Sequence, residues 1–104
     1  MRKAKIYVKG VEAGTLTELQ QGKDYLFEYL DGYEGLEVSR TMPKNVKVYK
    51  FDKFPPFFDG LLPEGIQLDG LLKIKKIDRN DHFSQLIAVG DDMVGVVTVK
   101  EIVE

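Results

Sequence analysis

Two adjacent prolines, Pro55 and Pro56, divide the chain into halves with different hydrophobic patterns. Neither proline can donate a backbone hydrogen bond, so a central strand cannot run through this point. Segments with period-two alternation precede the pair, and segments with helical spacing follow it. Strands grouped before helices are typical of an α+β domain. The length of 104 residues suits one domain, which we place at residues 1–104.

Five strands are predicted before the proline pair. The clearest begins at Lys3, where Ala4, Ile6 and Val8 alternate with polar side chains, as in a strand with one buried face. Glycines, the Asp31-Gly32 pair and a proline mark the ends of the segments. The predicted strands are residues 3–9, 15–19, 24–30, 36–41 and 46–51.

Two short helices are predicted after the pair. Pro63 suits the first turn of one helix, and Glu64 has the charge that this end favours. Asn80 or Asp81 can cap the other helix, which we expect to end at Gly90. The predicted buried faces are Leu68, Leu71 and Leu72 on the first helix, and Phe83, Leu86 and Ile87 on the second.

A nearly continuous apolar run, residues 93–99, predicts a last strand that is central or covered on both faces. The expected fold is therefore α+β. It is a small, mainly antiparallel β-sheet or partial barrel, with two short helices inserted before the last strand.

Composition excludes several classes of function. There is no cysteine, which excludes disulfides, thiolate metal sites and thiol catalysis. The 15 basic and 17 acidic residues are scattered and leave a net charge of -2, so direct nucleic-acid binding is not expected. No segment approaches the roughly 20 apolar residues of a membrane helix. We expect a cytoplasmic protein that does not bind membranes.

Candidate catalytic residues are few. His82, the one histidine, is open to interpretation as a base or ligand, but we prefer an exposed residue at a helix start. The run from Asp78 to Asp81 lacks the order of a kinase catalytic loop and the glycine of a calcium loop, so capping is preferred. Asp91 and Asp92 suit a turn better than a metal pair. We predict no enzyme activity, no metal and no cofactor.

The least ordinary segment runs from Phe51 to Ile66. It carries four phenylalanines beside three prolines. One interpretation is that the rings close one end of the sheet. The other is a partner-binding surface, because aromatic side chains on a rigid loop make good anchors.

This segment carries a resemblance to a known family. Phe57-Phe58-Asp59-Gly60-Leu61-Leu62-Pro63-Glu64-Gly65 resembles the Phe-Asp-x-Leu-Leu-Pro-(Glu/Asp) motif of the HipA N-terminal subdomain. Ala88-Val89-Gly90-Asp91-Asp92-Met93-Val94-Gly95 is similar to its Ala-x-Gly-x-Asp-x-x-Gly strand. Ser39-Arg40-Thr41-Met42-Pro43 is similar to its Ser-Leu-Ser-Met-Pro strand, but departs from it at Arg40 and Thr41.

In full-length members of that family a kinase core follows this subdomain. In split systems, the resemblance implies three proteins: a small one like this chain, a separate HipA-type Ser/Thr kinase toxin and a helix-turn-helix DNA-binding protein. Met1 stands just before the first predicted strand and Glu104 just after the last, so we expect a separate gene product. By this resemblance the chain binds and neutralises the kinase as an antitoxin.

The alternatives are a scaffold that binds the kinase without inhibiting it, a subdomain of a longer kinase and, more remotely, a small-ligand-binding domain. For the favoured interpretation we predict a partner-binding site near the catalytic cleft of the kinase. Its residues are Phe57, Phe58, Asp59, Leu61, Leu62, Pro63, Glu64, Ile66 and Gln67.

Overall fold

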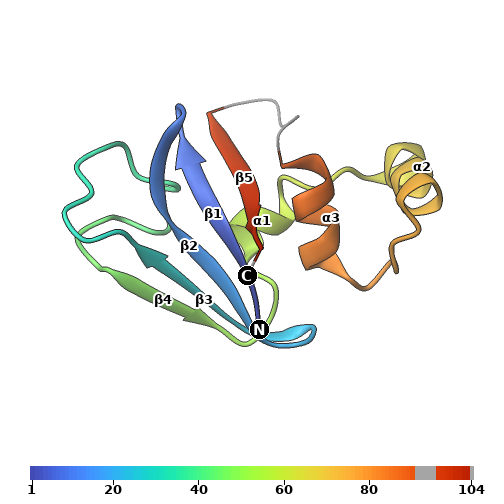
Figure 1. Ribbon diagram of the computed structural model, residues 1–104, viewed down its shortest axis with the longest axis horizontal. Coiled ribbons are helices and arrows are strands. Elements are labelled where there is room, and N and C mark those ends of the chain that lie inside the picture. The colour runs from blue at the N-terminus through green and yellow to red at the C-terminus, as the bar shows by residue number, and fades with distance from the viewer. Residues whose placement is uncertain (91–95, 104) are drawn as a thin grey trace.

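The computed structural model describes residues 1–90 and 96–103. In these residues, five strands form one open antiparallel sheet in the order β4-β3-β2-β1-β5, with three helices beside it (Figure 1). The α+β prediction is confirmed, and the sheet is open, not a barrel. The elements are β1 (Arg2–Val8), β2 (Val11–Gln20), β3 (Lys23–Tyr29), β4 (Val48–Phe51), α1 (Pro56–Asp59), α2 (Gly65–Lys75), α3 (His82–Val89) and β5 (Val97–Ile102).

The first hairpin is built by a two-residue turn. Lys9 and Gly10 have φ angles of 49° and 79°, and positive φ at both positions gives a turn whose twist matches that of the flanking strands. Farther along, Ile6 pairs with Gly14 but Tyr7 pairs with Glu12, so Ala13 forms a bulge. A side chain at position 14 would place its Cβ 2.3 Å from the carbonyl oxygen of Glu28. Glycine there lets β3 approach.

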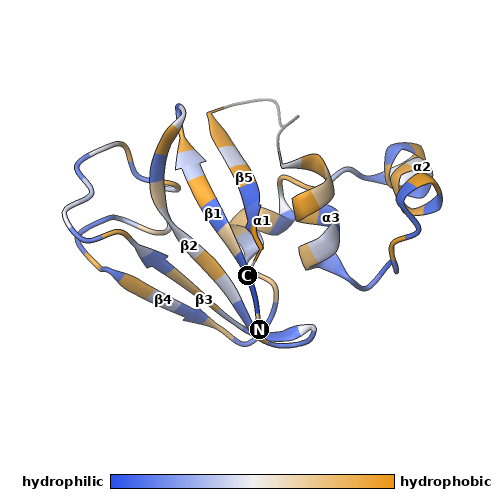
Figure 2. Ribbon diagram, viewed as in Figure 1, coloured by the Kyte–Doolittle hydropathy of each residue, from blue (hydrophilic) through white to orange (hydrophobic). Residues whose placement is uncertain are grey.

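The core lies between one face of the sheet and the helices. The alternation predicted for β1 is confirmed: Ala4, Ile6 and Val8 are buried. Orange and blue residues alternate along the strands in Figure 2, as expected for a sheet with one buried face. From the second half of the chain the core receives Phe58, Phe83, Leu86, Val97 and Val99.

The prediction of a central last strand is wrong. β5 pairs only with β1 among the described residues and forms one edge of the sheet. Val97 and Val99 are buried, while Val96, in the same apolar run, is exposed. The outer edge is partly covered by α3, because the Val99 N–H donates to the carbonyl of Gly90 at 3.1 Å. Residues 93–95 lie outside the described residues.

The predicted strand at residues 36–41 is also wrong. This stretch belongs to a long loop between β3 and β4, where the backbone forms one isolated bridge, between Ser39 and Met42. Side chains hold the loop instead of a ladder of backbone bonds. The buried hydroxyl of Tyr29 accepts from the Val38 N–H at 3.0 Å and donates to the carbonyl of Met42. Tyr49 donates to the carbonyl of Pro43 at 2.6 Å.

The helices differ from the predictions in two ways. A one-turn helix, α1, begins at Pro56 in the expected rigid connection, because proline is tolerated at a first helical position. The next helix, α2, begins at Gly65, so Pro63 precedes it and does not lie in its first turn. For α3 the predictions are confirmed: Asp81 caps it through the Ser84 N–H at 3.1 Å, and Gly90 ends it.

Candidate functional site

The candidate surface is the connection from α1 to α2 and the start of α2. Its aromatic part belongs largely to the core. Phe58 is fully buried (0% exposed), with its ring centroid 6.0 Å from that of Phe27, and the half-buried Phe57 packs edge-on against it at 5.2 Å. These two rings therefore pack into and against the core. Phe58 has no exposed surface to offer a partner.

The middle of the connection is a tight turn. The Leu61 N–H donates to the carbonyl of Phe58 and the Leu62 N–H to that of Asp59, both at 3.1 Å. Leu61 and Leu62 are half-buried against the core. Pro63 then fixes its own φ, which limits the conformational freedom of the chain just before α2. The connection is thus held at both ends.

Ile66 and Gln67 project into solvent from the first turn of α2. Ile66 is 89% exposed, an unusual state for a large aliphatic side chain. The helix around it buries none of its residues completely. Figure 1 shows why: α2 stands away from the sheet, beyond α3. Both side chains are accessible to a partner, and their binding of one remains a prediction.

A groove of about 260 Å³ lies beside this projection. One wall comes from the predicted segment, including Asp59, Pro63 and Glu64. The other comes from residues outside the predicted partner-binding site. They are Arg79, Asn80, His82 and Gln85, which join the groove through folding of the α2–α3 connection.

The second wall is held in place by side-chain hydrogen bonds. Gln85, which is buried, donates through Nε2 to the carbonyls of Asp78 at 3.2 Å and Arg79 at 2.9 Å. The carboxylate of Asp78 accepts from the Asn80 N–H at 2.7 Å. His82 packs against the ring of Phe54, with 5.5 Å between centroids. These contacts support a structural role for the run from residue 78 to 82.

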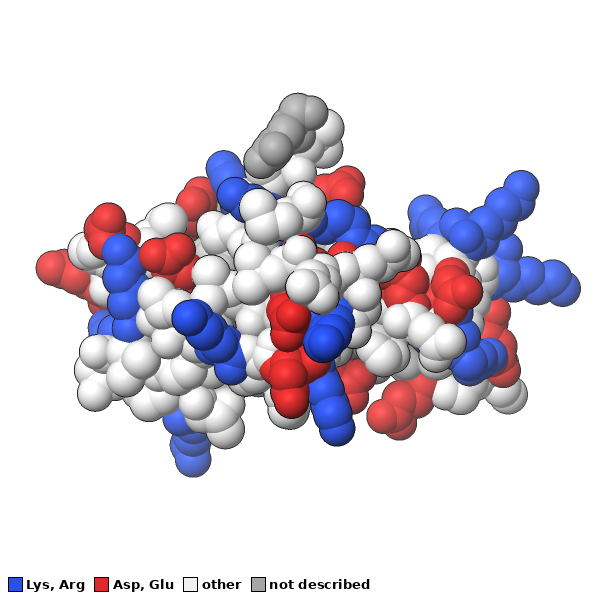
Figure 3. Space-filling model, turned by 90° about the horizontal axis from the view of Figure 1, so that it is seen from below, with Lys and Arg blue, Asp and Glu red and all other residues white. Residues whose placement is uncertain are grey.

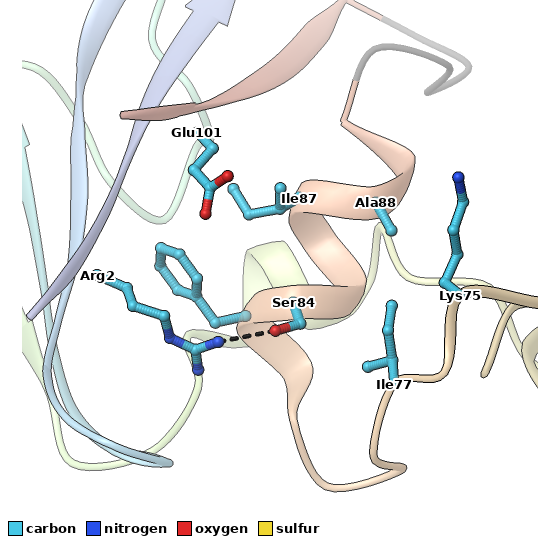
Figure 4. Close-up of a pocket in the computed structure, with 8 residues that line it drawn as sticks. Arg2, Lys75, Ile77, Ser84, Ile87, Ala88 and Glu101 are labelled. Carbon is cyan, nitrogen blue, oxygen red and sulfur yellow. Dashed lines mark hydrogen bonds between the residues drawn. The ribbon is translucent and has the colours of Figure 1, made fainter. Parts of the chain in front are cut away.

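An ion-pair network fixes α3, and with it the groove, to the sheet. Arg2 Nε lies 2.7 Å from Glu18 Oε1, and Arg2 Nη2 lies 2.9 Å from Asp81 Oδ1. Arg2 Nη1 also donates to Ser84 Oγ at 2.7 Å, the bond drawn in Figure 4. Arg2 and Ser84 line one side of a cavity of about 250 Å³ between α3 and the ends of β1 and β5.

The network lowers the pKa values of its two carboxylates. Burial alone would raise the pKa of Glu18, but hydrogen bonds from Arg2, Gly22 and Tyr25 hold that pKa below its ordinary value. Burial also opposes ionisation of Asp81, yet Arg2 and Ser84 keep the pKa of Asp81 lowered. Both groups are therefore carboxylates at neutral pH. They hold the fold together and offer no acid for catalysis.

Within residues 1–90 and 96–103, no group of three or more metal-ligating side chains is close enough to hold an ion. The Asp91–Asp92 pair lies outside the described residues.

In the part of the chain that the structure describes, no helix combines the length and the apolar character needed to cross a bilayer.

The fold and its surface define a class of protein: a small α+β domain with an open antiparallel sheet and a projecting helix that meets solvent. The family model described as the HipA N-terminal domain matches residues 4–100. The chain therefore belongs to the HipA N-terminal domain family, a non-catalytic domain found in a toxin-related context.

Two further comparisons found similar chains. A protein from Haemophilus influenzae is 30% identical over 101 residues, which cover 97% of this chain and 93% of that protein. The solved structure of the N-terminal domain of HipA toxin superimposes with a TM-score of 0.78 at 28% identity. That match covers 100% of this chain and 95% of the other. The expected family and the α+β fold are both confirmed.

Proposed function

We propose that this chain binds a HipA-type Ser/Thr kinase on a separate polypeptide and neutralises it, as the antitoxin-like subunit of a three-component system. Membership of the HipA N-terminal domain family supports a HipA-type partner. The observation that carries the proposal is the exposed Ile66 side chain at the end of a rigid connection. Such an anchor acts through the shape that it presents to a partner.

The proposed contact uses Ile66 as an anchor and the neighbouring groove as its rim. The side chain enters an apolar pocket near the kinase cleft, where burial of a large aliphatic group contributes about 2 kcal/mol. Glu64 and Gln67 are exposed neighbours of Ile66 in the chain and Asp59 lines the adjacent groove, so they supply the polar rim of a typical interface with an apolar centre. The turn before α2 is already ordered, so little conformational entropy is lost on binding.

Inhibition then follows from occupancy. A domain docked at the cleft blocks the protein substrate or holds the nucleotide-binding loop in an inactive shape, and neither needs chemistry from this chain. The helix-turn-helix protein is the proposed third component of the complex.

The test is Ile66→Asp, with affinity for the kinase measured by titration calorimetry. Loss of an apolar anchor and burial of a charge should weaken binding by about 2 kcal/mol. Leu36→Asp is the matched control, because Leu36 is also exposed (56%) but lies in the loop between β3 and β4, at the opposite end of the molecule from α2 (Figure 1). Equal affinity for wild type and Ile66→Asp would refute the proposed placement.

The second test separates an antitoxin from a scaffold. Kinase autophosphorylation is measured with and without a saturating amount of this protein. Neutralisation predicts loss of phosphorylation, and weaker inhibition by Ile66→Asp. Tight binding with undiminished phosphorylation would instead identify a scaffold that assembles the kinase.

A further inference from the structure

The helix α2 has two apolar faces, and the fold uses only one. Leu68, Leu71 and Leu72 are half-buried. Ile66, Gly70 and Ile74 follow each other at intervals of four residues, which places them in a row along the other side of the helix. Ile66 is 89% and Ile74 is 78% exposed. We call this row of three residues the outer face of α2.

Neither the backbone conformation nor the packing of this chain requires glycine at position 70, in the middle of the outer face. A glycine inside a helix costs up to about 1 kcal/mol relative to alanine. Its φ angle lies outside the left-handed region, so the backbone does not require glycine. A Cβ built at this position would meet nothing within 4 Å, so packing does not require it either.

What Gly70 provides is a notch between two large side chains. The distance between packed helices depends on the side chains at their point of contact, and a glycine there allows the closest approach of a second backbone. A notch flanked by Ile66 and Ile74 therefore fits a helix that crosses α2 at Gly70.

The charges beside the outer face indicate which charge the partner's surface should carry. Asp69, the one acidic residue of α2, is paired with Arg79. Lys73, Lys75 and Lys76 follow at the end of the helix and are exposed. At the α2 end of the molecule, Figure 3 shows basic side chains with acidic ones among them. The helix and Lys76 thus carry three lysines against one acidic residue that is already paired, so an acidic surface complements the helix.

We propose that the outer face of α2 packs against an acidic amphipathic helix of the kinase partner, which crosses α2 at Gly70. This inference rests on the proposed function and extends it, because it makes the contact a helix pair along Ile66, Gly70 and Ile74 instead of a single anchor. The apolar side of the partner helix covers the two isoleucines. Its acidic side faces Lys73, which is seven residues from Ile66 and therefore on the same side of the helix.

The decisive variant is Gly70→Ala, with the purified HipA-type kinase as the probe. Alanine favours the helix, so Tm of the free protein should rise by about 3–6 °C. The same methyl group fills the notch, so Kd for the kinase should rise at least about fivefold. Gly70→Leu, with a larger side chain, should raise Kd further. A stabilised protein that binds less tightly is the result expected for a notch used by a partner.

Two more variants examine the ends of the outer face and its charge. Ile74→Asp should raise Kd about tenfold or more. Lys73→Glu should slow association at low salt, an effect that fades as salt rises. Lys50→Glu, on the exposed edge strand β4, is the control and should leave association unchanged.

The outcomes separate the two proposals. If wild type fails to bind the kinase, both are overturned. If Ile66→Asp weakens binding while Gly70→Ala, Gly70→Leu and Ile74→Asp do not, the helix pair is overturned and the anchor stands. If wild type dimerises in sedimentation velocity and Ile74→Asp is monomeric, the outer face serves a second copy of this chain, which also overturns the inference.

Discussion

Arg2, in the first strand, binds Asp81, the capping residue of α3, with 2.9 Å between Nη2 and Oδ1. The two residues are 79 positions apart in the chain. The same guanidinium binds Glu18 of β2, whose side chain is only 4% exposed. One side chain thus joins two strands to the helix that builds the groove. Its loss should affect both stability and the position of α3.

Arg2→Met should lower the free energy of unfolding by about 2–4 kcal/mol, because it leaves the buried carboxylate of Glu18 without its cation. Methionine keeps an aliphatic side chain in place of the arginine stem but removes the guanidinium. Lys5→Met is the control: its ion pair with Glu12 is longer, at 3.6 Å, and more exposed, so the loss should stay below about 1 kcal/mol. Urea unfolding measures both. Equal losses would show that the Arg2 network contributes no more than a surface pair.

Acid should lower the free energy of unfolding through the same network. The pKa values of Glu18 and Asp81 are lower in the folded state than in the unfolded chain, where they lie at about 4. The unfolded chain therefore takes up protons first as the pH falls. The stabilisation is complete above about pH 5 and declines as the pH falls through the folded pKa values.

The measurement for this second prediction is the free energy of unfolding at pH 7, 5, 4 and 3. In Arg2→Met the two carboxylates lose the cation that lowers their pKa values, so the decline with acid should be shallower than in wild type. Parallel curves for the two proteins would contradict the assignment.

Tyr29→Phe should loosen the loop between β3 and β4. The buried hydroxyl serves the Val38 N–H and the carbonyl of Met42, and its removal leaves two buried backbone groups unsatisfied. A loss of about 1–3 kcal/mol is expected, with faster proteolysis in the loop. Tyr33→Phe is the control, because the Tyr33 hydroxyl binds the Leu36 carbonyl at the surface. Similar protease sensitivity in both variants would count against a special role for Tyr29.

Gly90→Ala should destabilise the protein, whereas Gly70→Ala should stabilise it. A Cβ on residue 90 would lie 2.2 Å from the carbonyl oxygen of Val99, so α3 and β5 would have to separate. The cost should be about 1–3 kcal/mol. The same methyl group at residue 70 enters open space in a helix. Thermal unfolding compares the two variants, and a shift of Tm in the same direction for both would show that the two glycines do not differ in this way.

Local pattern was sufficient for much of the fold. The alternation of Ala4, Ile6 and Val8 identified a strand with one buried face, and residue type limited the cap of the last helix to Asn80 or Asp81, of which Asp81 is the cap. These features depend on residues a few positions apart. The prediction of a strand at residues 36–41 failed because tyrosine hydroxyls of the two flanking strands hold this loop in place of a ladder.

The sequence predicted only part of the candidate site, because the rest depends on how remote segments pack. The segment from residue 57 to 67 stands out in the sequence, and Ile66 does project from it. Its composition did not reveal that Phe58 would be covered while Ile66 stayed in solvent. Nor did it show that Arg79 and Gln85 would complete the groove, since they reach it through the path of the α2–α3 connection.

Local sequence patterns thus specified most strands, caps and turns, and the motifs indicated the family. Three features required the folded molecule: the edge position of β5, the network centred on Arg2 and the unpartnered outer face of α2. Each depends on which remote segment lies against which surface. Burial is a property of that arrangement and not of a residue's neighbours in the chain, so a pattern of apolar residues cannot tell a core face from one that awaits a partner.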